Sequence, residues 1–411
     1  MVLLVDTLPR NSRNQGSINL GIEIASKKLD AKIVPWWTKL DCNEYDTIAF
    51  NVFYPTQLFN IWPFLYRNNI EPLKSKRSNI RLIAGGQGIG NNGILNEICD
   101  EVFLGEIDGD IVDSKGFHRA STIESPYVIK NNKAVVELTR GCKYRCKFCE
   151  YSWVHGGKYR EKEYDLVMQQ MAECKRNGIG NINFLSANFG GYSHVSDVMD
   201  FCLKNRIHIL NSDLCLKDAY KAIPLLRKTF IKVGVESFDE KTRIDVGKQI
   251  SDLELDEIID FSLKYCCGIH FYLIYGLPGD NYDKWYRWLE KLSKKRKDIT
   301  WRKIRFEFSI TNFEPCCGTP FEKMPVVDFQ KKHEFLKKWA DSLKEFGYRK
   351  TPEEIWYHNS RGRFGRKELS YKLLMTLKYG GVELTEKLIS TFPNGVNTSI
   401  NDEQAEKFLL T

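Results

Sequence analysis

Residues 141–151 read GCKYRCKFCEY and contain three closely spaced cysteines, Cys142, Cys146 and Cys149. They follow a predicted β-strand at 134–139, so their CxxxCxxC spacing falls where a strand passes into a loop. Three thiolates can bind three irons of a [4Fe-4S] cluster and leave the fourth iron open to a ligand that is not protein. Tetrahedral zinc normally takes a fourth cysteine or histidine, and His155 could supply it. The spacing favours an iron–sulfur site over zinc, and both over a disulfide.

The region 134–320 alternates apolar strands with amphipathic helices. The predicted strands are 134–139, 181–188, 207–214, 231–236, 270–275 and 303–311, and the predicted helices between them are 165–177, 195–205, 220–228, 253–265 and 282–294. This alternation is typical of a parallel sheet covered by helices. Six repeats predict a partial (β/α)6 barrel of the TIM type, with its active site at the carboxyl ends of the strands.

Residues 1–117 alternate in the same way and predict a doubly wound, Rossmann-like α/β domain. The ends of its predicted strands carry Asp6, Asn51 and the glycine-rich segment Gly85-Gly86-Gln87-Gly88. Ligands bind at this edge of an open parallel sheet, so we expect a pocket there. Residues 118–133 lose the periodicity and contain Ser125-Pro126, which predicts a linker.

Residues 321–411 show helical rather than strand periodicity and predict a helical C-terminal domain, with helices at 326–346, 368–377 and 384–391. Within 341–380, basic residues alternate with aromatic residues, among them Trp356, Tyr357 and Phe364. Such a stretch could bridge phosphates and stack on a base. A solvated helical cap explains it slightly better, so a nucleic-acid partner stays an open alternative.

The composition describes a chain without membrane-spanning character. Its 411 residues carry 61 Lys and Arg against 53 Asp and Glu, and the net charge of +8 is compatible with an anionic substrate. The 12 cysteines are spread over a long chain whose first residues, MVLLVDTLPR, do not resemble a signal peptide, which indicates a reducing, cytoplasmic location. No run approaches the ~18 to 20 apolar residues of a membrane span.

Four separated segments resemble the radical S-adenosylmethionine (SAM) superfamily. Cys142, Cys146, Phe148 and Cys149 fit its CxxxCxΦC signature. Val233-Gly234-Val235-Glu236-Ser237, followed by Lys248, resembles the "GxES" segment of the fourth strand and its downstream lysine. Residues 275–279 (YGLPG) and 313–320 (FEPCCGTP) resemble the "GLPG" and "PxxGTP" segments of the fifth and sixth strands. The matches occur in the family's order over residues 134–320.

The resemblance implies a [4Fe-4S] cluster whose open iron chelates SAM, and SAM cleavage to a 5'-deoxyadenosyl radical by an electron from a flavodoxin-type or ferredoxin-type donor. It implies that Phe148 lies beside the adenine, that Asp213, Glu236 and Ser237 reach the ribose, and that Arg243 meets the carboxylate of SAM. The family holds the SAM amino group with a "GGE" segment. The corresponding residues 186–191 read SANFGG and lack the acidic residue, so Asn188 or backbone carbonyls are expected in its place.

Cys316 and Cys317 are the candidates for a catalytic side chain, because they follow the sixth predicted strand and should lie near the active face. A thiol there could donate a hydrogen atom to a product radical or bind a second metal. Free cysteines are more commonly plain buried apolar residues, and Cys266-Cys267 shows that this chain also places such a doublet elsewhere.

An α/β domain that precedes a radical SAM domain resembles the cobalamin-binding architecture of the superfamily. Gly85-Gly86 and Gly105-Glu106 resemble its "GG" and "GE" turns. However, residues 1–117 contain no histidine, so the DxHxxG motif that offers a lower axial ligand is absent. Cobalamin binding and a repurposed pocket therefore stand as equal alternatives.

We expect a cytoplasmic radical SAM enzyme that abstracts a substrate hydrogen to rearrange or functionalise a carbon centre, with a nucleotide or modified nucleobase as one substrate class. The alternative is a cobalamin-dependent radical SAM methyltransferase that acts on a small metabolite. A non-catalytic iron–sulfur or zinc protein that binds nucleic acid through its basic tail belongs to another class, and the four matched segments disfavour it.

Overall fold

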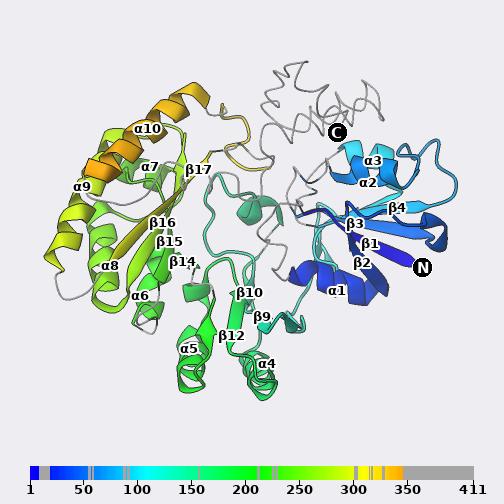
Figure 1. Ribbon diagram of the computed structural model, residues 1–411, viewed down its shortest axis with the longest axis horizontal. Coiled ribbons are helices and arrows are strands. Elements are labelled where there is room, and N and C mark those ends of the chain that lie inside the picture. Colours follow the sequence, from blue (N-terminus) through cyan, green and yellow to red (C-terminus); the bar gives the residue numbers. More distant parts are fainter. Residues whose placement is uncertain are drawn as a thin grey trace. The chain divides into compact units, whose positions relative to one another are not determined.

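The computed structural model describes residues 1–8, 19–53, 57, 60–86, 89, 93–155, 158–210, 213–224, 226, 230–299, 304–313, 315, 318–325 and 329–345. Two compact units divide this part of the chain after Ser121: unit 1 comprises residues 1–121 and unit 2 residues 122–345. Both contain parallel sheets with helices packed against them (Figure 1), which confirms the predicted α/β class. Within the described residues, no helix is both long and apolar enough to cross a membrane.

Unit 1 is built on a five-stranded sheet in which all neighbouring strands run parallel. Its spatial order is β2 (Ala31–Pro35), β1 (Val2–Asp6), β3 (Thr47–Asn51), β4 (Arg81–Gly85) and β5 (Glu101–Phe103). The winding reverses between β1 and β3, which is the position where ligands bind in sheets of this order.

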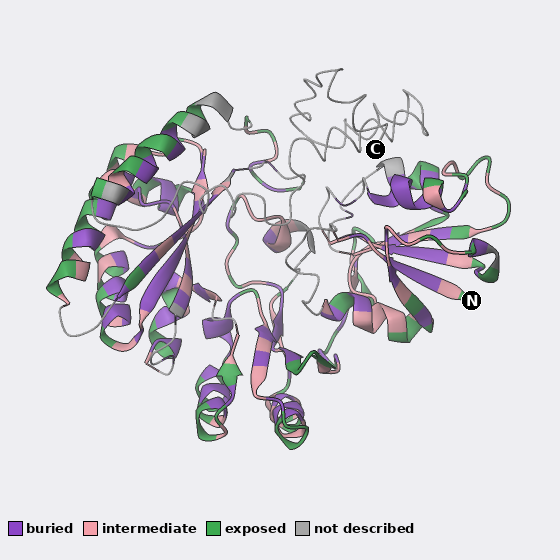
Figure 2. Cartoon of the chain, in the orientation of Figure 1, coloured by how far each residue is buried: buried purple, intermediate pink, exposed green. Residues whose placement is uncertain are grey.

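The helices of unit 1 cover both faces of the sheet (Figure 1). Successive residues of a strand point to opposite faces, so apolar strand residues on each face need a helix to pack against. Leu4 packs with Ile22 of α1 (Leu20–Leu29) on one face. Leu3 and Val5 pack on the other face against residues of α2 (Ile61–Arg67) and α3 (Gly93–Ile98). Burial on both faces explains why the strands read as continuous apolar runs (Figure 2).

The segment predicted as a linker carries strands in the structure. β7 (His118–Arg119) pairs antiparallel with β6 (Ile111–Val112) in unit 1. β8 (Val128–Lys130) pairs antiparallel with β9 (Lys133–Glu137) in unit 2. These strands are only two or three residues long, which is too short for a hydrophobic period to be read in sequence.

Unit 2 contains two four-stranded sheets. The first has the order β13 (His208–Ile209), β12 (Asn181–Leu185), β9 and β8, and the second has the order β14 (Asp213–Cys215), β15 (Phe230–Glu236), β16 (Gly268–Tyr275) and β17 (Arg305–Asn312). Every pair other than β8–β9 is parallel. The single strand predicted at 207–214 was wrong: its two ends form β13 and β14 in different sheets.

The remaining elements of unit 2 connect these strands. Its helices are α4 (Tyr164–Arg176), α5 (Val195–Lys204), α6 (Ala219–Ala222), α7 (Glu240–Asp245), α8 (Asp252–Tyr265), α9 (Tyr282–Asp298) and α10 (Phe329–Glu345). Its shorter elements are the antiparallel pair β10 (Thr139–Arg140) and β11 (Arg160–Glu161), the π-helical turn η4 (Tyr151–His155), and the 3-10 turns η5 (Phe189–Gly191) and η6 (Leu216–Asp218). The described part of unit 1 also includes the 3-10 turn η2 (Cys42–Glu44).

α10 joins the core of unit 2 through aromatic contacts. The ring centroids of Trp339 and Trp285 lie 5.8 Å apart, and those of Phe335 and Trp285 lie 5.6 Å apart. This helix is the described part of the predicted C-terminal domain. The predicted helices 368–377 and 384–391, the residues Trp356, Tyr357 and Phe364, and the doublet Cys316-Cys317 lie outside the described residues.

Candidate active site

The three cysteines of the CxxxCxxC segment lie on a loop directly after β10. Cys146 is buried, and Cys142 and Cys149 are half-buried. The loop is tied at two adjacent residues: Lys147 donates its backbone N–H to the carbonyl of Val246 at 2.9 Å, and the indole of Trp153 donates to the carbonyl of Cys146 at 2.9 Å. The thiols lie close enough to interact electrostatically, since Cys149 raises the pKa of both Cys142 and Cys146.

The thiols of this loop lie in the field of a buried cation. Burial raises the pKa of Cys146 to about 12, and the nearby Lys248 opposes that shift. Burial also raises the pKa of Cys142, and Lys248 again favours the thiolate. Thiolates are the form that binds metal, so this donor set fits a [4Fe-4S] cluster, in which each cysteine binds a different iron.

The alternative of a single zinc ion depends on His155 as the fourth ligand. The side chain of His155 lies outside the described residues. Among the side chains that are described, no three of His, Cys, Asp or Glu converge on a point that one metal ion could occupy.

Lys248 pairs with Glu236 beneath the cysteine loop. Glu236 ends β15 with a φ of 64°, where the register against β16 shifts at a bulge. Gly234 makes room for the pair, since a Cβ there would lie 2.7 Å from Glu236 Oε1 and 3.2 Å from Lys248 Nζ. The "GxES" glycine and the downstream lysine thus belong to one local structure.

The side chain of Asn188 lies in the turn after β12 and contacts Asp218, which Tyr144 contacts as well. Asn188 is buried, donates from Nδ2 to Asp218 Oδ2 at 2.5 Å, and accepts the backbone N–H of Cys215 at Oδ1. The hydroxyl of Tyr144 donates to Asp218 Oδ2 at 2.8 Å. Sequence reasoning missed Asp218, which belongs to a segment with no motif of its own, and Tyr144, which occupies a position that the CxxxCxΦC signature leaves open.

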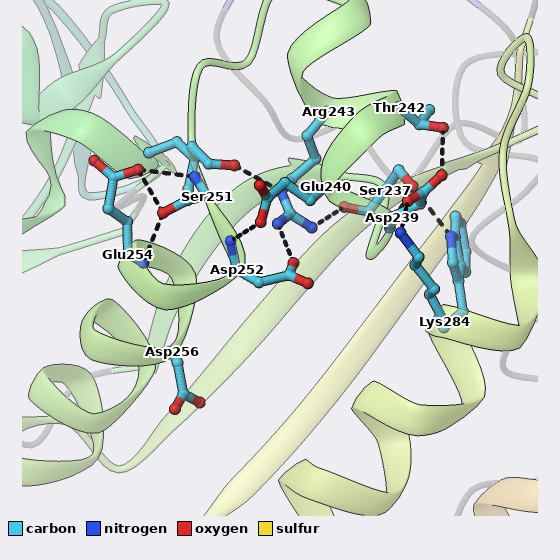
Figure 3. A network of polar contacts seen from close by, with 12 residues as sticks. Ser237, Asp239, Glu240, Thr242, Arg243, Ser251, Asp252, Glu254, Asp256 and Lys284 are labelled. Atoms are coloured by element: carbon cyan, nitrogen blue, oxygen red, sulfur yellow. Dashed lines mark hydrogen bonds and ion pairs between the residues drawn. The ribbon is translucent and has the colours of Figure 1, made fainter.

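Two further predicted ligand residues, Ser237 and Arg243, are fully buried within the protein. The Ser237 hydroxyl donates to Asp280 Oδ1 at 2.7 Å. The Arg243 guanidinium donates to the carbonyls of Ser237 and Ile250 and pairs with Asp252 (Figure 3). These contacts give Ser237 and Arg243 structural roles, and we leave both out of the ligand set proposed below.

Phe148 and Asp213 are placed where a ligand could reach them. Phe148 is half-buried and packs in a small apolar cluster whose buried members are Val246, Leu277, Phe313 and Phe321. That cluster joins the cysteine loop to the segments that resemble "GLPG" and "PxxGTP". Asp213 begins β14, and its side chain is 48% exposed.

Cys215 is a thiol near the cysteine loop that belongs to none of the sequence motifs. It ends β14, and its backbone N–H donates to Asn188 Oδ1 at 2.9 Å. Burial raises the pKa of Cys215, with Lys248 lowering and Cys142 raising it further. β14 thus brings a fourth thiol, that of Cys215, close enough to interact electrostatically with Cys142 of the loop. No spacing in the sequence indicates this proximity.

At the carboxyl edge of the unit 1 sheet, polar side chains gather at the end of β1 and β3. Thr7 is fully buried and donates from its hydroxyl to the carbonyl of Asn51 at 2.6 Å, while Asn60 Nδ2 donates to the carbonyl of Thr7 at 2.6 Å. Asn51 Nδ2 and Asn60 Oδ1 are buried and have no hydrogen-bond partner within the described chain. Gly86 has a φ of +115°, and a Cβ there would lie 2.5 Å from the carbonyl oxygen of Val52.

The family model of the radical SAM superfamily matches residues 136–292, which include the three cysteines and the Glu236–Lys248 pair. This chain contains a radical SAM domain. Members of the superfamily use a [4Fe-4S] cluster and SAM, act on small-molecule substrates and need a reductant.

Relatives of this radical SAM enzyme cover most of its length. An uncharacterized protein of Methanocaldococcus jannaschii is 23% identical over 345 residues, which make up 74% of this chain and 74% of that protein. The radical SAM methyltransferase TsrM from Kitasatospora setae is similar in structure with a TM-score of 0.52 and 12% identity, covering 94% of this chain and 89% of that one. The cobalamin-dependent SAM radical enzyme OxsB, with aqua-cobalamin bound, has a TM-score of 0.52 and 14% identity, covering 100% and 83%. These likenesses establish the fold of the radical SAM enzyme.

The histidine count of the N-terminal domain changes with its observed boundary. Residues 1–117 contain no histidine, as the sequence shows, but unit 1 extends to Ser121 and includes His118. The His118 ring stacks on Phe103 with centroids 4.5 Å apart, so its imidazole lies at the end of β5.

Proposed function

We propose that Cys142, Cys146 and Cys149 hold the [4Fe-4S] cluster of this radical SAM enzyme. When bound, the cluster supplies the electron that cleaves SAM to a 5'-deoxyadenosyl radical. The observation that carries the proposal is the fixed cysteine loop beside Lys248, a buried cation that favours the thiolate form of Cys142 and Cys146. The protein's own task is to position the reacting carbon of SAM against one substrate hydrogen and to exclude other groups.

We further propose that the parallel strands of the two sheets of unit 2 together form the partial (β/α)6 barrel. The six strands would be β9, β12, the β13–β14 segment, β15, β16 and β17. The loops that follow their carboxyl ends carry the cysteines, Asn188, Cys215 and the Glu236–Lys248 pair. A shared active face at these ends is what the barrel architecture predicts.

For SAM itself, we propose that Phe148 contacts the adenine and that Asp213 accepts a hydrogen bond from the ribose. Both side chains are partly exposed, unlike Ser237 and Arg243. The Glu236 carboxylate already accepts from Lys248, so its proposed part is to keep that cation beside the thiols.

For the reaction, we propose hydrogen abstraction that leads to rearrangement or functionalisation of a carbon centre in a small molecule. A nucleotide is the first substrate class to test, because basic and aromatic residues alternate over 341–380. The electron donor would be a flavodoxin-type or ferredoxin-type protein.

Anaerobic reconstitution tests the central proposal. We expect about four irons per chain, as a single [4Fe-4S] cluster requires, and conversion of SAM to 5'-deoxyadenosine with a strong reductant. Cys146→Ala should remove both properties. The matched control is Cys174→Ala, which changes a fully buried cysteine of α4 and should keep both. SAM cleavage that survives Cys146→Ala would overturn the proposal.

The second candidate function is a cobalamin-dependent radical SAM methyltransferase that acts on a small metabolite. The observation that favours it is the pair of buried, unpartnered amide atoms, Asn51 Nδ2 and Asn60 Oδ1, at the winding reversal between β1 and β3. Buried polar atoms without partners call for a ligand or water, and the corrin periphery is rich in amides. Gly86 lets the backbone approach closely at the same edge.

Corrinoid binding separates the two candidates. If unit 1 binds cobalamin, hydroxocobalamin should remain on the chain after gel filtration and give corrinoid absorbance. Asn60→Leu should lower the bound fraction, whereas Asn79→Leu, at an exposed site before β4, should not. Wild-type protein that elutes without corrinoid absorbance would remove the basis of the methyltransferase candidate.

A further inference from the structure

The turn that resembles "GGE" without its glutamate has a carboxylate beside it from another part of the chain. Asp218 ends η6, which follows β14, and its carboxylate reaches the turn after β12. A Cβ on Gly190 would lie 2.8 Å from the Asp218 carbonyl oxygen, and a Cβ on Gly191 would lie 2.6 Å from Asn188 Nδ2 and 3.4 Å from Asp218 Oδ2. The two glycines therefore allow Asp218 to pack against the turn.

Two of the groups that sequence reasoning offered in place of the missing glutamate, the Asn188 side chain and the Gly191 carbonyl, already have protein partners. Both polar atoms of the Asn188 side chain have protein partners, Cys215 and Asp218. The carbonyl of Gly191 accepts from Lys143 Nζ at 2.7 Å and from the Tyr159 hydroxyl at 3.0 Å. An amino group at this turn would find both of these acceptors occupied.

Asp218, by contrast, is held firmly by one oxygen only. Its Oδ2 accepts from Asn188 and from Tyr144, and its Oδ1 accepts no hydrogen bond from the described part of the chain. Tyr144 stands between Cys142 and Cys146, so the contact fixes the carboxylate beside the cysteine loop. Both donors to Oδ2 are neutral groups, an amide and a phenol, so neither compensates the negative charge of the carboxylate.

We propose that the Asp218 carboxylate accepts a hydrogen bond from the α-amino group of SAM. Asp218 would thus supply, from the segment after β14, the carboxylate that the turn after β12 lacks. This inference rests on the proposed function, because it assumes that SAM binds at the cysteine loop. A charge-assisted hydrogen bond at a partly buried site contributes more than a neutral one, so its loss should be measurable in binding.

The test compares two ligands on cluster-reconstituted protein by anaerobic calorimetry. S-adenosylhomocysteine carries the α-ammonium group, whereas 5'-methylthioadenosine keeps the adenosine and sulfur but lacks the amino-acid portion. Asp218→Asn keeps the size of the side chain and an acceptor for Asn188 and Tyr144 but removes the charge. We expect it to weaken S-adenosylhomocysteine about tenfold or more and to leave 5'-methylthioadenosine unchanged. The matched control is Asp197→Asn, the same change on the exposed face of α5, which should alter neither.

Retained binding of 5'-methylthioadenosine reports that the variant is folded at the site. Equal weakening of both ligands, or unchanged binding of both, would overturn the role of Asp218. The proposed function fails separately, if reconstituted wild-type protein neither cleaves SAM nor binds S-adenosylhomocysteine. If the wild-type protein cleaves SAM but Asp218→Asn binds S-adenosylhomocysteine as tightly as wild type does, only the role of Asp218 is contradicted.

Discussion

Lys248 Nζ lies 2.9 Å from Glu236 Oε1, and the two side chains are only 11% and 12% exposed. Burial by itself would lower the pKa of Lys248, but Glu236 and the thiols of Cys215 and Cys146 raise it above its ordinary value. Lys248 is therefore a permanent cation beneath the cysteine loop. Glu236 compensates that charge from a strand end whose backbone adopts a positive φ.

Replacing one partner of this ion pair should destabilise the protein more than replacing both partners together. Lys248→Met leaves Glu236 as a buried, uncompensated charge, and Glu236→Gln does the same to Lys248, at a cost of about 3–5 kcal/mol each. The double variant should be less destabilised than the sum of the two single variants, because neither charge remains. Urea unfolding followed by circular dichroism measures the three changes, and strict additivity would contradict a direct interaction.

Gly247→Ala should disturb the cysteine loop through the backbone. Gly247 has a φ of +96°, and a Cβ there would lie 3.2 Å from the carbonyl oxygen of Arg145 and 3.3 Å from Cys146 Cα. The variant should lose about 1–2 kcal/mol of stability through strain and also bind less iron on reconstitution. Gly178→Ala is the control, since Gly178 has a φ of +72° with nothing within 4 Å of a new Cβ. Gly178→Ala should lose stability but bind as much iron as wild type. Equal iron contents in the two variants would refute a specific contact between Gly247 and the loop.

Because of Asp280, the free energy of unfolding should fall as the pH rises towards neutrality. Burial raises the pKa of Asp280 from 3.8 to about 7, although Ser237 and Trp285 donate to its Oδ1. The folded state therefore binds a proton that the unfolded state has released, so the stabilising contribution is present below about pH 4 and is lost as pH rises through about 7.

Asp280→Asn mimics the protonated side chain at every pH. The free energy of unfolding of the variant should exceed that of wild type by an amount that grows from about pH 4 to about pH 7 and stays constant above it, as measured by thermal unfolding across that range. Asp200→Asn, the same change at an exposed position of α5, serves as the control. A constant difference in Tm between Asp280→Asn and wild type would contradict the raised pKa.

Arg243→Lys should lower stability without a selective effect on SAM binding. Lysine keeps the charge but cannot reproduce the fork of bonds to Ser237, Ile250 and Asp252 (Figure 3). Buried acceptors left without donors cost about 1–3 kcal/mol each, so the Tm should fall by about 5 °C or more. The ratio of the dissociation constants for S-adenosylhomocysteine and 5'-methylthioadenosine should stay at the wild-type value. A changed ratio would restore Arg243 as a ligand of the SAM carboxylate.

The sequence by itself determined the features that depend on local spacing. The three cysteines lie within eight residues, so one loop can carry all three whatever the rest of the fold does. The alternation of apolar strands and amphipathic helices is also a local signal, and it predicted the parallel α/β class in both units. Gly234 and Lys248 could be recognised in advance because they belong to segments that resemble known ones.

Only the tertiary structure decided which distant segments meet. The strand predicted at 207–214 is divided between two sheets because hydrogen-bond partners, not apolar periodicity, fix where a strand belongs. That division places Cys215 and Asp218 beside residues of the cysteine loop and of the turn after β12. Arg243 looked like a ligand because charge is visible in sequence, whereas its complete burial is not. Burial and partner choice are properties of packing across the sheets, and no spacing along the chain encodes them.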